Sequence, residues 1–222
     1  MLQSGRVTVD GEIVRNPAFS IDENAACIRL DGEDIVYSPA LHLMLYKPAG
    51  FLTAADDARR KTVMDLLPRF ARSQGCMPVG RLDMDTEGLL LFTSDGQLAH
   101  RLLSPKRRVE KRYQALVDAP LSSIDVEAFA KGIPLSDFVA LPAALEIADD
   151  ARTAYVTLIE GKYHQVKRMF AARGNRVNSL KRLSFGGVWL DSALAAGDWR
   201  ALIPSEVETL YAVAGIARET HE

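Results

Sequence analysis

The chain has 222 residues, of which 48% are hydrophobic, and a formal net charge of -2 at pH 7. A chain of this length can bury one substantial core and carry a smaller appendage. No stretch approaches the ~20 apolar residues of a membrane-spanning helix. The two cysteines, Cys27 and Cys76, suit a reduced protein and offer neither a disulfide framework nor a zinc site. We therefore expect a soluble, cytoplasmic protein with no membrane partner.

Residues 1–38 are predicted to form a small opening unit of two β-hairpins. Asp10-Gly11 lies between two short runs rich in β-branched residues, and Asp31-Gly32 lies between residues 27–30 and 35–37. Asp-Gly between apolar runs is a strong signal for a two-residue hairpin turn. Such a unit is too small to hold a core of its own. Ser38-Pro39 is the predicted linker to a larger domain over residues 39–222.

The larger domain is predicted to mix strands and helices. Alternating or continuous apolar residues indicate the strands, and apolar residues three or four apart indicate the helices. Thr62 is a plausible N-cap of the first helix, which Pro68 is expected to end. The predicted strands are 41–46, 77–79, 89–93, 109–117, 140–147, 154–160 and 186–191, and the predicted helices are 62–67, 97–103, 125–131, 166–173 and 206–213.

The most informative stretch is a charged turn between two glycines. Residues 80–88 read GRLDMDTEG and lead directly into the apolar run 89–93. This arrangement places Asp83 at the edge of a sheet, half sheltered from water and within reach of Arg81. The environment of a sheltered carboxylate sets its reactivity, so Asp83 is a candidate acid, base or nucleophile.

Other interpretations of this stretch are a metal loop, a purely structural turn and a glycosidase pair. A calcium loop that begins at Asp83 needs a bidentate Glu at its twelfth position, which is Ser94. In a structural turn, Arg81 would pair with a neighbouring carboxylate. Asp83 and Asp85 could act as a glycosidase pair, but residues two apart need not converge on one bond. Asp85 is more simply explained as a structural residue that stabilises the loop.

Basic residues gather in two segments. Residues 101–112 hold six Lys or Arg and one acid, and residues 162–182 hold seven and no acid. The rest of the chain is strongly acidic. A chain with a basic face can bind a phosphate backbone locally, whereas two solvated helix faces are the simpler alternative.

Two further stretches contain candidate site residues. In the strand 109–117, Tyr113 shares one face with Ala115 and Val117, as expected of a core tyrosine with a solvated hydroxyl. In the helix that ends at Gly174, the apolar residues are expected to be buried. His164, Lys167 and Arg168 then project toward solvent or a cleft.

Three motifs, in order, resemble those of the RsuA-like family of rRNA pseudouridine synthases. Residues 80–89 are similar to its G-R-L-D-x-D-T-x-G-L signature, residues 110–113 (EKRY) to its E-K-x-Y motif, and residues 161–169 (GKYHQVKRM) to its third motif. The resemblance implies an α+β catalytic domain with a long, mainly antiparallel, bent sheet flanked by helices. It also implies isomerisation of uridine to pseudouridine in RNA, with no cofactor and no metal.

The resemblance assigns a role to each matching residue. Asp83 is the catalytic carboxylate, Lys167 is its basic partner, and Tyr113 stacks on the target base. Arg81 occupies the space that the flipped base leaves, Leu180 is an apolar wall of the uracil pocket, and Arg168 contacts phosphate. The other residues assigned to RNA or base binding are His164, Gln165 and Lys111.

Residues 1–38 resemble the back half of the S4-like RNA-binding domain of this family. The two helices that open the family pattern have no counterpart here, so a partial S4-like unit is expected. Within the family, residues 6–16 favour the small-subunit enzymes, which implies uridine 516 of 16S rRNA as the target, free or in a small-subunit assembly particle, and a monomeric enzyme. The alternatives are a 23S rRNA enzyme of the same family and a catalytically weak RNA-binding ribosome-assembly factor.

Overall fold

The computed structural model describes residues 2–21, 26–35 and 40–217. The chain divides into two compact units, Met1–Ala40 and Leu41–Glu222. The predicted linker Ser38-Pro39 and the end of the second predicted hairpin, residues 36–37, lie outside the described residues.

The small unit is a four-stranded sheet with the strand order β2-β1-β3-β4. Both predicted hairpins are confirmed: β1 (Val7–Val9) pairs with β2 (Glu12–Ile13), and β3 (Ile28–Leu30) pairs with β4 (Glu33–Ile35). At both Asp-Gly turns the two central residues have positive φ, 51° and 87° at Asp10-Gly11 and 55° and 87° at Asp31-Gly32. Positive φ at both positions is what a type I′ turn requires.

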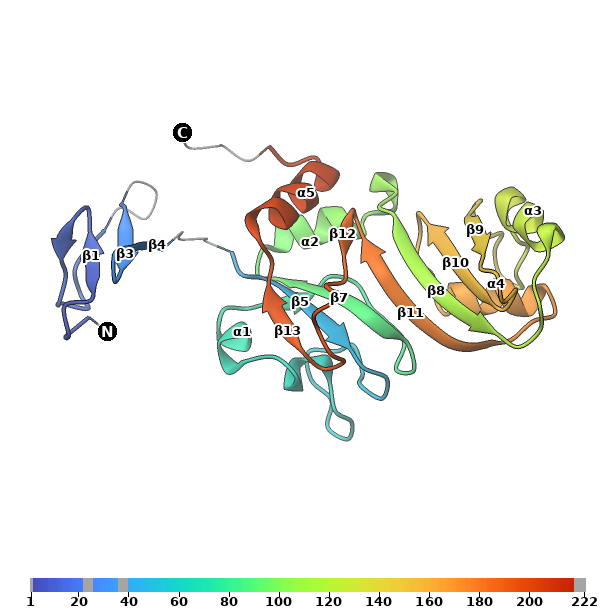
Figure 1. Cartoon of the computed structure of the whole chain (residues 1–222), viewed down its shortest axis with the longest axis horizontal. Coiled ribbons are helices and arrows are strands. Elements are labelled where there is room, and N and C mark those ends of the chain that lie inside the picture. The colour runs from blue at the N-terminus through green and yellow to red at the C-terminus, as the bar shows by residue number, and fades with distance from the viewer. Residues whose placement is uncertain (1, 22–25, 36–39, 218–222) are drawn as a thin grey trace. The chain divides into compact units, whose positions relative to one another are not determined.

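The large unit contains a nine-stranded sheet with the main order β13-β5-β7-β11-β8-β10-β9 (Figure 1). Its strands are antiparallel except for β11 and β7, which run parallel and place Arg182 opposite Gly88. This mixed, mainly antiparallel sheet confirms the expected fold class. The strands are β5 (His42–Lys47), β6 (Met77–Pro78), β7 (Glu87–Thr93), β8 (Lys111–Val117), β9 (Ala144–Ile147), β10 (Thr153–Leu158), β11 (Val177–Phe185), β12 (Val188–Trp189) and β13 (Trp199–Ala201).

Helices flank the sheet on both faces. In Figure 1, α2 and α5 lie on one side of β5 and β7, and α1 lies on the other. Helices α3 and α4 lie next to the strands β8 to β10. The helices are α1 (Arg69–Ser73), α2 (Gly96–Leu103), α3 (Ser123–Lys131), α4 (Gln165–Ala172) and α5 (Pro204–Ala214), with short 3₁₀ turns η1 (Val63–Asp65) and η2 (Pro105–Arg107).

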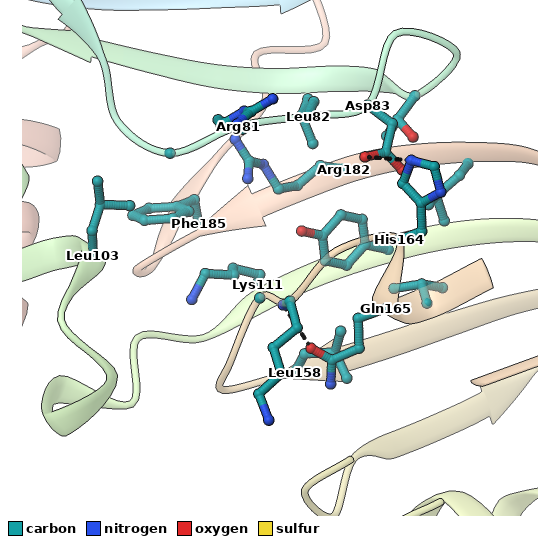
Figure 2. A pocket seen from close by; sticks show the side chains of 17 residues that line it. Arg81, Leu82, Asp83, Leu103, Lys111, Leu158, His164, Gln165, Arg182 and Phe185 are labelled. Atoms are coloured by element: carbon teal, nitrogen blue, oxygen red, sulfur yellow. Dashed lines mark hydrogen bonds and ion pairs between the residues drawn. The ribbon is translucent and has the colours of Figure 1, made fainter. Parts of the chain in front are cut away.

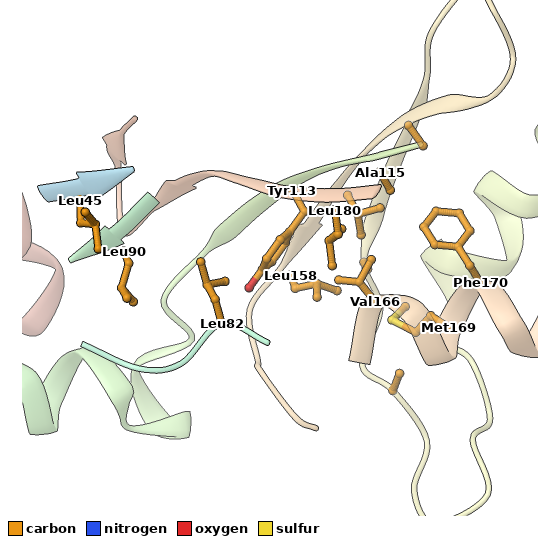
Figure 3. Close-up of a cluster of buried hydrophobic side chains, with 14 of the residues drawn as sticks. Leu45, Leu82, Leu90, Tyr113, Ala115, Leu158, Val166, Met169, Phe170 and Leu180 are labelled. Atoms are coloured by element: carbon orange, nitrogen blue, oxygen red, sulfur yellow. The ribbon is translucent and has the colours of Figure 1, made fainter. Parts of the chain in front are cut away.

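The two central strands β5 and β7 are buried on both faces. On β5, Leu43 and Leu45 belong to one apolar cluster and Met44 to a second one, and Leu90 and Leu91 divide in the same way on β7. Alternate side chains of a strand point to opposite faces, so these strands read as continuous apolar runs. Figure 3 shows the larger cluster, which continues from Leu45 and Leu90 past Tyr113 to Phe170 on α4.

Several predicted elements change form in the structure. The predicted helix 62–67 is a single 3₁₀ turn, η1, which Thr62 caps. Pro68 does not end a helix; with φ -66° and ψ 152° it begins α1, which was not predicted. Residues 177–182 belong to the long strand β11, and β13 was also missed. Within the described residues, no helix is both long enough and apolar enough to cross a bilayer.

Candidate active site

The loop between β6 and β7 carries Asp83 and is held from two sides. Thr53 Oγ1 donates to the carbonyl of Leu82 (2.7 Å) and accepts from its amide (3.2 Å). The loop returns to the sheet at Gly88, which has φ +102°. A Cβ atom there would lie 2.2 Å from the backbone oxygen of Arg182, so only glycine lets β7 and β11 approach this closely.

Lys47 lies under the loop and is completely buried. Its ammonium nitrogen lies within hydrogen-bond distance of four carbonyl oxygens, those of Pro48 (3.0 Å), Asp83 (3.1 Å), Met84 (3.3 Å) and Thr86 (2.8 Å), which share its three N–H donors. Burial lowers its pKa to about 8, although Asp85 and Asp83 act in the opposite direction. This cation therefore fixes the backbone of the loop and does not touch its carboxylates directly.

The side chain of Asp83 is paired with Lys167 from the first turn of α4. Lys167 Nζ lies 3.0 Å from Asp83 Oδ2 and 2.5 Å from Asp85 Oδ1, so one cation joins both carboxylates. Burial alone lowers the pKa of Lys167, but the hydrogen bonds that it donates to Asp85 and Asp83 outweigh burial and raise that pKa. The same hydrogen bond from Lys167 lowers the pKa of Asp85. Lys167 is thus held in its charged form beside Asp83.

His164 approaches Asp83 from another direction, because it precedes α4 in a left-handed conformation with φ +49°. Its Nε2 lies 3.5 Å from Asp83 Oδ1, and its ring stacks on Tyr163 at a centroid distance of 3.8 Å. Figure 2 shows the dashed line between His164 and Asp83. The side chain of Asp83 is 27% exposed, so the carboxylate is partly sheltered but open to a ligand.

Next to Asp83 is a cavity of about 150 Å³ with one largely apolar wall. Tyr113 on β8 and Leu180 on β11 are both more than nine-tenths buried and line it, together with Leu158 and Val166. Figure 3 shows Tyr113 and Leu180 on adjacent strands above the Leu158 and Val166 side chains. The site therefore combines a flat aromatic surface, an aliphatic wall and a cation-paired carboxylate. This arrangement suits a planar, uncharged base whose sugar meets the carboxylate.

Seven of the nine predicted site residues line this cavity: Arg81, Asp83, Lys111, Tyr113, His164, Gln165 and Leu180. Arg81 is exposed at its rim. Lys167 does not line the cavity but acts on it through Asp83. The predicted strands and motifs thus converge on one place in the structure.

Two predicted RNA contacts are already engaged within the protein. Arg168 does not line the cavity; it pairs with Asp137, donates to Ser136 Oγ and lies over the ring of Phe138. The side chain of Gln165 is 4% exposed and donates to Glu160 (2.6 Å) while it accepts from the amide of Lys162 (2.9 Å). It therefore stabilises the loop before α4. The expected direct contact of either side chain with RNA needs one of these partners to be displaced.

Three features were not predicted from the sequence. Asp85 was expected to stabilise its own loop, but it shares Lys167 with Asp83. The role of Lys47 under the loop was missed. Arg182 was counted with the basic face, but it is 2% exposed and lines the cavity.

Comparison with known proteins identifies the class of enzyme. Residues 41–172, more than half of the chain, match the family model of RNA pseudouridylate synthases. The RNA pseudouridine synthase YtzG of Bacillus subtilis is 42% identical over 214 residues, 95% of this chain and 90% of that protein. Ribosomal small subunit pseudouridine synthase A of Escherichia coli K12 is 40% identical over 213 residues, with 94% and 90% covered.

The fold agrees with this comparison. A crystal structure of a pseudouridylate synthase superposes with a TM-score of 0.73 at 38% sequence identity and covers 94% of this chain and 90% of that one. The chain belongs to the RNA pseudouridylate synthase family. It is a pseudouridine synthase of the RsuA-like branch, an isomerase that acts on RNA.

Proposed function

We propose that this enzyme converts one uridine of ribosomal RNA, uridine 516 of 16S rRNA, to pseudouridine and that Asp83 starts the reaction. Relatives named ribosomal small subunit pseudouridine synthase A, which match 94–95% of the chain, support the small-subunit target. The single observation that supports the chemistry is the position of Asp83, paired with Lys167 at the edge of a cavity that Tyr113 and Leu180 line.

The reaction exchanges one bond of the nucleotide for another. The bond between ribose C1′ and uracil N1 breaks, the base turns, and C1′ bonds to C5; N1 gains a proton and C5 loses one. No oxidant, reductant or second substrate is needed. The Asp83 carboxylate supplies the electron pair that begins bond cleavage, as nucleophile or base, and Lys167 pairs with it and orients it.

The target base must leave the RNA stack to reach Asp83. In this proposal, the flipped uracil lies against the Tyr113 ring, and stacking of this kind contributes roughly 1–3 kcal/mol per base. Leu180 contacts the base from the neighbouring strand. Arg81, exposed at the rim of the cavity, occupies the space that the base has left. The two basic segments hold the RNA backbone through electrostatic attraction.

The four-stranded unit at the start of the chain is proposed as a partial S4-like RNA-binding unit. Two tight hairpins in one small sheet support this proposal. When the basic side chains of this unit are replaced by uncharged ones in the intact chain, the protein should bind rRNA less well. Its turnover on saturating RNA should not change.

Mapping of pseudouridine in 16S and 23S rRNA tests the proposed function. The RNA would come from cells that lack the gene and from the same cells with the wild-type gene or Asp83→Asn, which keeps the shape of the side chain and removes its charge. A single 16S uridine modified only with the wild-type gene is the expected result. A 23S site instead would overturn the target but keep the chemistry. Modification at the wild-type level with Asp83→Asn would refute the role of Asp83.

An RNA-binding factor without activity is the competing function, and the same cells distinguish it. In that case no uridine in either RNA would depend on the gene, although the purified protein would still bind rRNA. For Asp83→Asn we expect turnover to fall by about 10⁴-fold or more, as for other removed nucleophiles, with little change in RNA affinity.

A further inference from the structure

Arg182 is a buried arginine whose charge is not paired with any acidic side chain of the described residues. Its side chain is 2% exposed, and Nε donates to the backbone oxygen of Leu89 at 2.7 Å. Nη2 is buried and has no hydrogen-bond partner, and none of the described acidic residues forms a salt bridge with Arg182. Burial of an unpaired cation costs several kcal/mol, so a buried group of this kind indicates a missing partner.

The surroundings of Arg182 contain a second cation and a second unsatisfied group. Lys111, on the neighbouring antiparallel strand β8, lines the same cavity, and among the described residues its Nζ donates only to the backbone oxygen of Val109 (2.7 Å). Both cations approach the ring of Phe185, whose centroid is 5.2 Å from Arg182 Cζ and 5.3 Å from Lys111 Nζ. Thr86 Oγ1, also on the cavity wall, is buried without a partner.

The two ends of the cavity carry opposite groups. Figure 2 shows the Arg182 guanidinium, Phe185 and Lys111 around one end, and Asp83 with His164 at the other. Asp83 is the one carboxylate among the residues that line the cavity, and Lys167 already neutralises it. The Arg182 end therefore has two positive charges and no negative one among the described lining residues. Such an end attracts an anion more strongly than a neutral carbonyl.

We propose that Arg182 and Lys111 form a binding site for a phosphate group of the RNA, adjacent to the flipped uridine. This inference rests on the proposed function, because it assigns a place to the phosphate of that substrate. The planar guanidinium provides a free N–H arm for one phosphate oxygen, and the ammonium of Lys111 approaches as a point charge. The Thr86 hydroxyl can donate to the same oxygens.

A phosphate anchor has a specific use in this reaction. During the isomerisation the base must turn while the ribose C1′ stays beside Asp83. The base contacts Tyr113 and Leu180, whose side chains present a ring face and an aliphatic surface that permit rotation. A phosphate fixed by two cations immobilises the sugar and leaves the base free to turn. Arg182 and Lys111 thus position the substrate and take no part in bond breaking.

The test compares nucleosides with and without phosphate on the intact chain. Uridine, uridine 5′-monophosphate and uridine 3′-monophosphate would be titrated into wild type, Arg182→Met and Lys111→Met by calorimetry. We expect at least one monophosphate to bind wild type about tenfold more tightly than uridine, since a charged hydrogen bond contributes enough for about this ratio. Arg182→Met should abolish this preference, and Lys111→Met should reduce it several-fold.

Lys181→Met is the matched control. Lys181 precedes Arg182 on β11, but its Nζ lies over the Tyr46 ring (4.4 Å) and it does not line this cavity. The variant loses the same charge from the same strand and should keep the phosphate preference. A purely structural role of Arg182 would weaken uridine and its monophosphates equally. Three results would each overturn the proposal. The first is a wild-type protein that binds no monophosphate more tightly than uridine. The others are a phosphate preference that is unchanged in both Arg182→Met and Lys111→Met, or one that is lost equally in Lys181→Met.

Arg182→Lys covers the case in which Arg182→Met does not fold. It keeps a buried charge but removes the second arm of the guanidinium, so a reduced preference is expected. The proposed function has a separate readout, because wild-type binding ratios require no turnover. An enzyme that forms pseudouridine without a phosphate preference refutes only the phosphate site. A preference that depends on Arg182 without any pseudouridine formation refutes only the proposed function.

Discussion

The two ends of the cavity differ in how their charges are compensated. At the Asp83 end, Lys167 pairs with both carboxylates and Lys47 binds the loop carbonyls from below. At the other end, Arg182 and Lys111 have backbone oxygens as their hydrogen-bond acceptors among the described residues, and Arg182 Nη2 has no hydrogen-bond acceptor there. The charged groups at the Asp83 end thus have their partners without a ligand, whereas those at the Arg182 end do not.

This difference separates reaction from recognition. Groups that take part in chemistry gain from being held in place before the substrate arrives, because no reorganisation is then needed. Groups that recognise a charged ligand must keep free donors for it. Lys47 on β5 and Arg182 on β11 are both buried cations of the large sheet, but Lys47 has hydrogen-bond acceptors for its ammonium group and Arg182 Nη2 has none, so we infer opposite uses for them.

Lys47→Met should have the largest effect on stability, because it leaves buried carbonyls of the Asp83 loop without a donor. We expect the free energy of unfolding to fall by about 3–5 kcal/mol, as for other broken buried charge contacts, and turnover to fall as the loop loosens. Urea unfolding measures the first change. Lys61→Met, an exposed lysine on a loop, is the control and should stay within about 0.5 kcal/mol of wild type. Equal unfolding midpoints for both variants would show that Lys47 is not needed to hold the loop.

Lys167→Met should have the next largest effect, on chemistry more than on binding. It removes a charged hydrogen bond to Asp83, which is typically worth about 1.5–3 kcal/mol. We therefore expect kcat to fall by roughly 10–100-fold, with little change in KM, since Lys167 does not line the cavity. Lys167→Arg should recover part of the loss. A rise in KM alone would mean that Lys167 contacts RNA and not mainly Asp83.

The pH dependence of phosphate binding should reveal the smaller contribution of Lys111. Burial and the charge of Arg182 lower the pKa of Lys111 to about 8, while Glu160 acts in the opposite direction. Below this pH the ammonium is charged and binds phosphate; above it the charge is lost. Affinity for the preferred uridine monophosphate should therefore decline as pH rises through about 8 to 9.5, by up to about tenfold, because bound phosphate itself raises this pKa. Lys111→Met should bind more weakly at pH 7 and show no such decline.

Much of the site was predictable because its motifs are local. The turn 80–88, the face of Tyr113 and the end of α4 at Gly174 each depend on a few neighbouring residues. The same holds for both Asp-Gly hairpins of the small unit. In each case the local pattern and the final structure agree.

The unpredicted part depends on contacts between distant segments. Arg182 and Leu89, which share a hydrogen bond, are 93 positions apart and meet only because β11 pairs in parallel with β7. In the sequence, Arg182 is one more residue of a basic segment. Lys47 and the carbonyl of Asp83 are 36 positions apart, and neither has a pattern that identifies the other. Local signals of this kind cannot show which cation will be buried or what it will contact.

Arg168→Gln should have the smallest effect, although Arg168 is the immediate neighbour of Lys167. The sequence motif suggested a phosphate contact, but in the structure Arg168 pairs with Asp137, whose side chain is 63% exposed. Exposed ion pairs contribute about 0–1 kcal/mol, so the free energy of unfolding should change by less than about 1 kcal/mol. Turnover and RNA affinity should stay within about twofold of wild type. A tenfold loss of RNA affinity, with unchanged affinity for uridine monophosphates, would instead show that Arg168 leaves Asp137 when RNA binds. In that case the phosphate contacts of the enzyme would extend beyond Arg182 and Lys111 to the outer face of α4.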